Sequence, residues 1–265
     1  MEISLKGKVI VINGGTKGLG RAAVEAVSEA GAEVVFSGRN LKDAEEVIKT
    51  VKEKKGKDVI FSQGCLKDVN NCKKLIDTAI GNFGKLDGLV NYSGITNISS
   101  IIDTTEELFD EVFSINFKAA FFCSKFAMEK MIKEGGSIVH IGSAHSYGGD
   151  IIRAAYGTSK GSILSLSKHI AKNYAKYQIR SNIITMGWII TPNEIKLAKS
   201  MGFDTEWLNE QGKRTIPMGR LQINEDYTPC ILYLLSDLSS QLTDSEIHIT
   251  GGFWPSYGHK THEEI

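Results

Sequence analysis

Seven short, mostly apolar runs recur along the chain, and segments with apolar residues at helical spacing separate them. The runs lie at residues 9–12, 33–37, 58–62, 86–91, 137–141, 180–185 and 246–249. Several are almost continuously apolar, which is typical of parallel strands covered by helices on both faces. We therefore predict an α/β fold with a doubly wound parallel sheet of about seven strands, which binds ligands beyond the carboxyl ends of its strands.

The helical pattern is clearest after residue 68. Asp68 is placed to cap this helix, and the apolar stripe that follows consists of Val69, Cys72, Leu75, Ile76, Ala79, Ile80 and Phe83. Longer helices are expected at residues 105–133 and 155–177.

We expect one domain over residues 1–265. The chain has 265 residues and only 4 prolines, and no Gly/Ser-rich stretch divides it. Within this domain, residues 188–215 are expected to cover the substrate.

Charge and composition exclude several classes of protein. The 31 basic and 31 acidic residues balance, so no overall field attracts nucleic acid. The longest apolar run, residues 230–235, is much shorter than the about 20 residues of a membrane span. The cysteines lack zinc-ligand spacing, and His259 and His262 lie in a polar tail. We expect a cytoplasmic protein without a metal, nucleic acid or membrane partner.

A glycine-rich segment directly follows the first apolar run and precedes a helical pattern. Its glycines, Gly14, Gly18 and Gly20, follow the spacing Gly-x-x-x-Gly-x-Gly. Glycines allow a tight turn and close approach to a pyrophosphate, which the helix N-terminus then attracts. The segment therefore predicts a Rossmann-type dinucleotide site.

From this turn onward the chain resembles the short-chain dehydrogenase/reductase family over nearly its whole length. The matching segments, in the family's order, are residues 83–87, residues 91–94, Ser143, residues 156–160, Gly187 with Thr191, and Gly251-Gly252. The resemblance implies that the following residues bind the cofactor: Gly14, Thr16, Lys17, Gly18, Leu19, Gly20, Arg39, Asn91, Gly94, Tyr156, Lys160, Gly187, Ile189 and Thr191.

The chain departs from the family pattern at several positions. Asn13 stands where the family usually has threonine, and Tyr92 and Ser93 replace the second and third residues of its Asn-Asn-Ala-Gly segment. Cys65 occupies the position of an aspartate that commonly contacts adenine, and Met186 replaces a proline. None of these changes removes a reactive group.

The end of the second apolar run indicates which nicotinamide cofactor is used. NAD enzymes of this fold usually place a carboxylate there for the ribose hydroxyls, whereas residues 36–40 contain none. Arg39 follows where a 2′-phosphate would lie, and Lys17 can approach the same phosphate from the glycine turn. We therefore predict NADP(H) as the cofactor.

Tyr156 and Lys160 are four residues apart in a segment that reads as helical, so their side chains share a face. Lowering a tyrosine pKa from about 10 to about 7 requires roughly 4 kcal/mol, which an ammonium and an oxidised nicotinamide can supply. Tyr156 is then the acid or base for the reacting oxygen, and Lys160 tunes it. Ser143 can donate to the same oxygen, and Asn116 matches the family asparagine that orients a water.

Two alternative functions, a hydrolase and a non-catalytic sensor, have less support in the sequence than an oxidoreductase. Residues 157–161 match the Gly-x-Ser-x-Gly elbow of hydrolases, but that elbow needs a strand immediately before Ser159. A non-catalytic NADP-binding sensor is the stronger rival, and the complete set of Asn116, Ser143, Tyr156 and Lys160 argues against it.

The resemblance also implies a homotetramer, because family members usually pair through the two long helices. For the substrate we predict a bulky apolar ketone or secondary alcohol, such as a hydroxysteroid. This prediction depends on the apolar side chains of the covering segment and tail: Trp188, Ile189, Ile190, Leu197, Met201, Phe203, Trp207, Leu208, Phe253, Trp254 and Tyr257. The alternatives are a polyol and a 3-oxoacyl group on an acidic carrier protein, which Glu134 would repel.

Overall fold

The structure is a computed structural model and describes residues 3–148 and 150–254. Its strands are β1 (Val9–Asn13), β2 (Glu33–Gly38), β3 (Val59–Gln63), β4 (Gly88–Asn91), β5 (Gly136–Ser143), β6 (Ile179–Met186) and β7 (Glu246–Ile249). They form one seven-stranded sheet in the order β3-β2-β1-β4-β5-β6-β7, and every neighbouring pair is parallel. The predicted fold class is therefore confirmed, with strand ends within two residues of the apolar runs.

The α-helices connect the strands. They are α1 (Gly18–Glu29), α2 (Leu41–Glu53), α3 (Val69–Phe83), α4 (Glu106–Phe113), α5 (Ala119–Met131), α6 (Ala154–Tyr174), α7 (Pro192–Ser200), α8 (Thr205–Thr215) and α9 (Asn224–Leu235). Short helical turns are η1 (Ser114–Lys118), η2 (Ala144–Ser146), η3 (Ala175–Tyr177) and η4 (Asp237–Ser239). Among the described residues, no helix is both long and apolar enough to cross a membrane.

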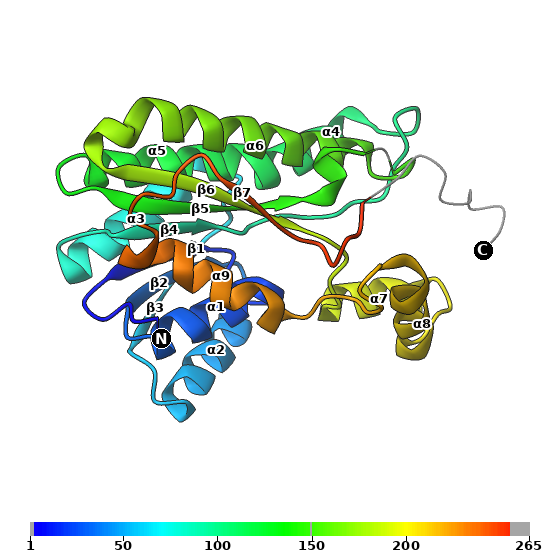
Figure 1. The fold of residues 1–265 in the computed structure, drawn as a ribbon, viewed down its shortest axis with the longest axis horizontal. Helices are drawn as coiled ribbons and strands as arrows, with labels where there is room; N and C mark the ends of the chain where they lie inside the picture. Colours follow the sequence, from blue (N-terminus) through cyan, green and yellow to red (C-terminus); the bar gives the residue numbers. More distant parts are fainter. Residues whose placement is uncertain (1–2, 149, 255–265) are drawn as a thin grey trace.

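Alternating strand residues face two separate cores. Ile10 and Ile12 pack with α1, α2 and α9, whereas Val9 and Val11 pack with α3, α5 and α6. Figure 1 shows these two helix layers on opposite faces of the sheet. Burial on both faces explains why the strands read as continuous apolar runs.

The helix expected at residues 68–83 forms as α3, and the Asp68 side chain caps it by accepting from the Asn70 backbone N–H. The two longer helices differ from the prediction. The first contains a turn of π-helix, η1, between α4 and α5, and the last turn of the second is the 3₁₀-helix η3.

Helices α7 and α8 project from the end of the sheet where the strands finish (Figure 1). They occupy the segment predicted to cover the substrate. Their apolar side chains form a small core of their own with residues after β5 and β7, which contains Ala144, Ala198, Leu208, Ile216, Leu221 and Phe253. Tyr257, His259 and His262 lie outside the described residues.

Candidate active site

The site begins where the strand order reverses, at the adjacent carboxyl ends of β1 and β4. Asn13 and Asn91 are partners in the parallel register, and Asn13 Nδ2 donates to Asn91 Oδ1 over 2.6 Å. Asn13 Oδ1 accepts from the backbone N–H groups of Tyr92 and Ser93, at 2.7 Å each. Asn13 thus anchors the loop that continues β4 to the end of β1, a role that the sequence did not reveal.

Asn91, predicted to bind the cofactor, uses its side chain inside the protein. Its Nδ2 lies 2.9 Å from Ser124 Oγ and 3.3 Å from His140 Nδ1. Burial and the nearby Lys160 charge lower the pKa of His140 to about 3, so this imidazole is neutral. Asn91 therefore acts on the site indirectly, through its hydrogen bond with Asn13, which holds the loop after β4.

The glycine turn is packed too tightly for side chains. Gly14 and Gly18 have positive φ values of +77° and +55°. A Cβ on Gly14 would lie 2.7 Å from Ser93 Oγ, and one on Gly20 would meet the Tyr92 ring. The turn consequently presents the N-terminus of α1 at the switch point.

A surface hollow of about 630 Å³ adjoins this turn and the end of β2. Its lining consists of Thr16, Lys17, Arg39, Asn40, Leu41 and Asp43. The structure thus places both predicted phosphate ligands, Lys17 and Arg39, at one hollow. It also adds a carboxylate, because Asp43 Oδ2 lies 3.0 Å from Lys17 Nζ. Asp43 was not predicted, because it lies in the first turn of α2 and not at the end of β2.

Lys160 is a cation buried in the centre of the site. Only 5% of it is exposed, and its Nζ donates to the Ile141 carbonyl over 2.8 Å. Burial lowers the pKa of Lys160 to about 8. A lysine in such an environment is typical of functional sites.

Tyr156 lies one helical turn before Lys160 and beside Ser143, at the end of β5. Burial raises the pKa of Tyr156, while a hydrogen bond with Ser143 and the charge of Arg153 act in the opposite direction. The lowered pKa expected from the sequence is therefore not a property of the protein alone. His145, which the sequence argument missed, lies with its ring centroid 5.9 Å from that of Tyr156.

Asn116 lies in the π-helical turn η1, and such turns occur frequently at functional sites. Its amide pairs with both backbone groups of Ile95, at 2.8 and 3.0 Å, and its Nδ2 also donates to Ser159 Oγ. Ser159 in turn donates to the Tyr156 carbonyl. Because Ser159 lies inside α6, it does not follow a strand as a hydrolase nucleophile would.

Gly94 lies directly against these groups. A Cβ on Gly94 would lie 3.4 Å from Asn116 Oδ1 and 3.5 Å from Lys160 Nζ. Gly94, Asn116 and the buried ammonium are therefore close together, and Tyr156 begins the same turn of α6.

The segment after β6 closes the other side of the site. Gly187 donates its N–H to the Ile249 carbonyl, and Ile189 forms a bridge with Gln222. Thr191 caps α7, with its Oγ1 accepting from the Glu194 N–H, and its Cγ2 lies 3.9 Å from the Cβ position of Gly18. All three predicted residues of this segment thus lie at the carboxyl end of the sheet.

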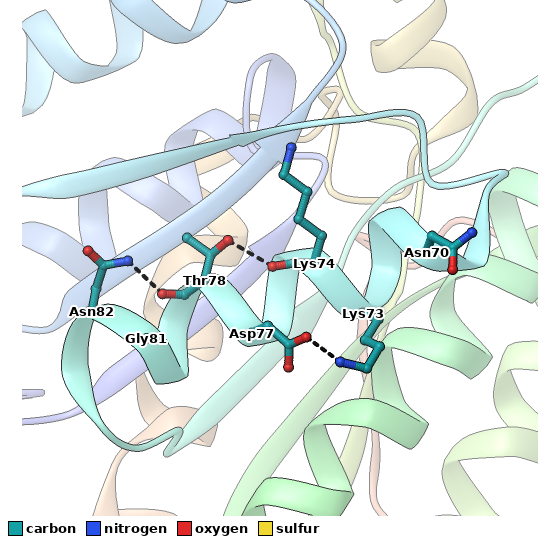
Figure 2. A pocket seen from close by; sticks show the side chains of 7 residues that line it. All are labelled: Asn70, Lys73, Lys74, Asp77, Thr78, Gly81 and Asn82. Atoms are coloured by element: carbon teal, nitrogen blue, oxygen red, sulfur yellow. Dashed lines mark hydrogen bonds and ion pairs between the residues drawn. The ribbon is translucent and has the colours of Figure 1, made fainter.

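A second hollow, of about 570 Å³, follows α3 and is a surface feature of that helix alone. Figure 2 shows pairs within the helix: Lys73 contacts Asp77, and Thr78 donates to the Lys74 carbonyl. The Lys74 ammonium donates to the Gln63 carbonyl at the end of β3. Within residues 3–148 and 150–254, no group of His, Cys, Asp and Glu side chains could hold a metal ion.

A doubly wound sheet, a glycine turn at its switch point, and a tyrosine and lysine one turn apart define a dinucleotide-binding oxidoreductase of the Rossmann type. The comparisons with known proteins specify the family. A family model described as enoyl-(acyl carrier protein) reductase matches residues 14–254. The chain belongs to the short-chain dehydrogenase/reductase family.

Individual relatives cover almost the entire chain. The NADP-dependent (R)-specific alcohol dehydrogenase of Lentilactobacillus kefiri is 34% identical, over 96% of this chain and 99% of its own length. The dehydrogenase/reductase SDR family member 4 of Caenorhabditis elegans is 33% identical, over 93% and 95%. The crystal structure of L-sorbose reductase from Gluconobacter frateurii, complexed with NADPH and L-sorbose, superposes with a TM-score of 0.91 at 25% identity, covering 97% of this chain and all of that one. The protein is accordingly an oxidoreductase that acts on alcohol or ketone groups.

Proposed function

We propose that the protein transfers hydride between NADP(H) and a ketone or secondary alcohol, with Asn116, Ser143, Tyr156 and Lys160 as its catalytic set. The observation that carries this proposal is the buried ammonium of Lys160, which lies one helical turn after Tyr156 and close to Gly94 and Asn116 at the switch point. The glycine turn fits the pyrophosphate of such a cofactor, and the neighbouring hollow at Lys17 and Arg39 fits its 2′-phosphate.

The cofactor supplies or accepts the hydride at the substrate carbon. During ketone reduction, Tyr156 donates its hydroxyl proton to the carbonyl oxygen, and Ser143 donates a hydrogen bond to the same oxygen. During alcohol oxidation, Tyr156 accepts that proton. Lys160 would hold the ribose next to the nicotinamide, and Asn116 keeps the backbone at residue 95 in place. Burial raises the pKa of Tyr156 in the ligand-free protein, and the positive charge of an oxidised nicotinamide would lower it during alcohol oxidation.

Cofactor preference is proposed from the charges at the hollow. Lys17 and Arg39 favour a 2′-phosphate, whereas Asp43 neutralises part of the Lys17 charge. The Arg39→Ala variant should lose most of the preference for NADPH over NADH in kcat/KM. Asp43→Asn should increase that preference up to about fivefold, because an exposed ion pair contributes about 0–1 kcal/mol. An unchanged ratio in Arg39→Ala would refute the preference for NADP(H).

The bulky apolar substrate stays a prediction, and the packing of the apolar side chains gives it less support than the sequence did. Most of the apolar side chains invoked for it pack against each other, including Phe203 and Trp207, which stack at 4.1 Å. The side chains that act on Tyr156 are polar: Arg153 and Glu194 influence its pKa, and His145 lies beside its ring. This polar lining favours a second candidate, a substrate with several hydroxyl groups, and the L-sorbose reductase relative supports it.

NADP(H)-linked activity over four panels would rank these substrates: steroid alcohols, sugar alcohols, simple ketones and 3-oxoacyl thioesters. Activity confined to sugar alcohols or to carrier-bound thioesters would refute the hydroxysteroid proposal and leave hydride transfer standing. NADPH binding without consumption in any panel would identify a sensor.

A homotetramer is proposed from the family. Phe109 on α4 and Phe121 on α5 are each 43% exposed, which suits helices that pair with a second copy. A monomeric mass by light scattering at micromolar concentration would refute it.

A further inference from the structure

Tyr92, one of the departures from the family pattern, reaches into the glycine turn. Its hydroxyl oxygen lies 3.0 Å from the position that a Cβ on Gly18 would take. Its ring covers Gly20, whose Cβ would lie 2.5 Å from Tyr92 Cδ1. The side chain thus runs from the end of β4 to the first turn of α1.

A second departure holds this side chain in place. Asn13 Oδ1 accepts from the Tyr92 backbone N–H over 2.7 Å, and the same oxygen accepts from Ser93. The methyl group of Thr191 lies 3.9 Å from the Cβ position of Gly18. The hydroxyl therefore lies where β4, the N-terminus of α1 and the start of α7 meet.

The hydroxyl has one proton to donate at this place. Burial raises the pKa of Tyr92 to about 12, while the nearby backbone N–H groups of Leu19 and Gly20 act in the opposite direction. The group is therefore protonated at neutral pH.

We propose that the Tyr92 hydroxyl is an additional cofactor-binding group, which accepts from the N-terminal amides of α1 and donates to the pyrophosphate that this helix terminus attracts. The inference rests on the proposed function, because it requires a dinucleotide in the cleft. It extends the anion site by one neutral donor, which acts on the pyrophosphate and not on the 2′-phosphate. Tyr92 should therefore strengthen the binding of NADP(H) and NAD(H) equally.

The test compares Tyr92→Phe with the unmodified protein in titrations with NADPH, NADH, ADP-ribose and adenosine 2′-monophosphate. The first three contain the pyrophosphate, and the last contains only the adenosine and the 2′-phosphate. Each pyrophosphate ligand should bind roughly 10- to 150-fold more weakly, which corresponds to the about 1.5–3 kcal/mol of a hydrogen bond to a charged group. Adenosine 2′-monophosphate should bind unchanged. Tyr174→Phe, at the end of α6, is the matched control and should alter no affinity.

Three results would overturn the inference: unchanged affinities, tighter binding because the helix amides have been released, or an equal loss for adenosine 2′-monophosphate. The last would show a structural effect on the whole site, and the melting temperature of the ligand-free variant checks this independently. If the unmodified protein binds none of the dinucleotides, the proposed function itself fails. If it binds them and Tyr92→Phe does so equally well, only the role of Tyr92 fails.

Discussion

Replacing Lys160 with methionine is expected to make the ligand-free protein more stable while abolishing turnover. Burial lowers the pKa of Lys160 from 10.5 to about 8, and its side chain is only 5% exposed. Since each pKa unit corresponds to about 1.4 kcal/mol, the folded state is destabilised by about 3 kcal/mol when this lysine is charged. Loss of the hydrogen bond to the Ile141 carbonyl offsets about 1 kcal/mol.

The net gain at pH 7 is therefore about 2 kcal/mol in the free energy of unfolding, or about 4–8 °C in melting temperature for a chain of this size. This stability difference between the variant and the wild type should decrease as the pH rises. Below pH 8 both the folded and the unfolded lysine are protonated, so the destabilisation is complete. As the pH rises from about 8 to 10.5, the folded protein releases this proton first, and the gap between variant and wild type should close.

Equilibrium urea unfolding at pH 7, 8, 9 and 10, at a fixed protein concentration, measures this gap. Lys168→Met is the matched control, because Lys168 lies on the same helix and is exposed. It should change stability by less than about 0.5 kcal/mol. A Lys160→Met variant that is less stable than wild type at pH 7, or a gap independent of pH, would refute the account of this lysine.

Two further predictions concern the scaffold and the cleft. Asn13→Ala should lower the free energy of unfolding by about 2–4 kcal/mol, because three hydrogen bonds are lost and their partners are left buried. In the same urea titration the control variant, Asn82→Ala at an exposed position, should lose less than about 0.5 kcal/mol. An equally small loss for Asn13→Ala would contradict its anchoring role. Gly94→Ala should preserve the melting temperature, because its Cβ would make only ordinary contacts, but weaken NADPH binding by about tenfold or more, since the new methyl group would lie against Lys160 Nζ and Asn116 Oδ1. Gly81→Ala, with open space around its Cβ position, should leave NADPH affinity unchanged, and normal affinity in Gly94→Ala would show that the cofactor does not pass this point.

The sheet could be predicted from the sequence because its strands are buried on both faces, so that each reads as an apolar run between helical segments. The π-helical turn at residues 114–118 could not, since its apolar residues fit an ordinary helical stripe. The predicted residues Ser143, Tyr156 and Lys160 do gather at one end of the sheet, because strand ends and one helix face dictate their places.

Contacts between residues far apart in the sequence could not be predicted from apolar runs and helical spacing. The pairing of Asn13 with Asn91 depends on the register of β1 and β4, and that of Asp43 with Lys17 depends on how α2 starts. One signal was available for His140: a histidine within the apolar run 137–141 needs a buried partner, which the structure supplies in Asn91.

Transfer of deuterium from labelled NADPH to a product tests the central claim most directly. The enzyme is incubated with NADPH that carries deuterium at the transferable position of the nicotinamide, together with each ketone of the substrate panels. Mass spectrometry then locates the label. We expect the label on the carbinol carbon of one product alcohol with the wild-type protein, and none with Tyr156→Phe, which should still bind NADPH. Binding of NADPH without label transfer to any substrate, or equal transfer by Tyr156→Phe, would contradict the account.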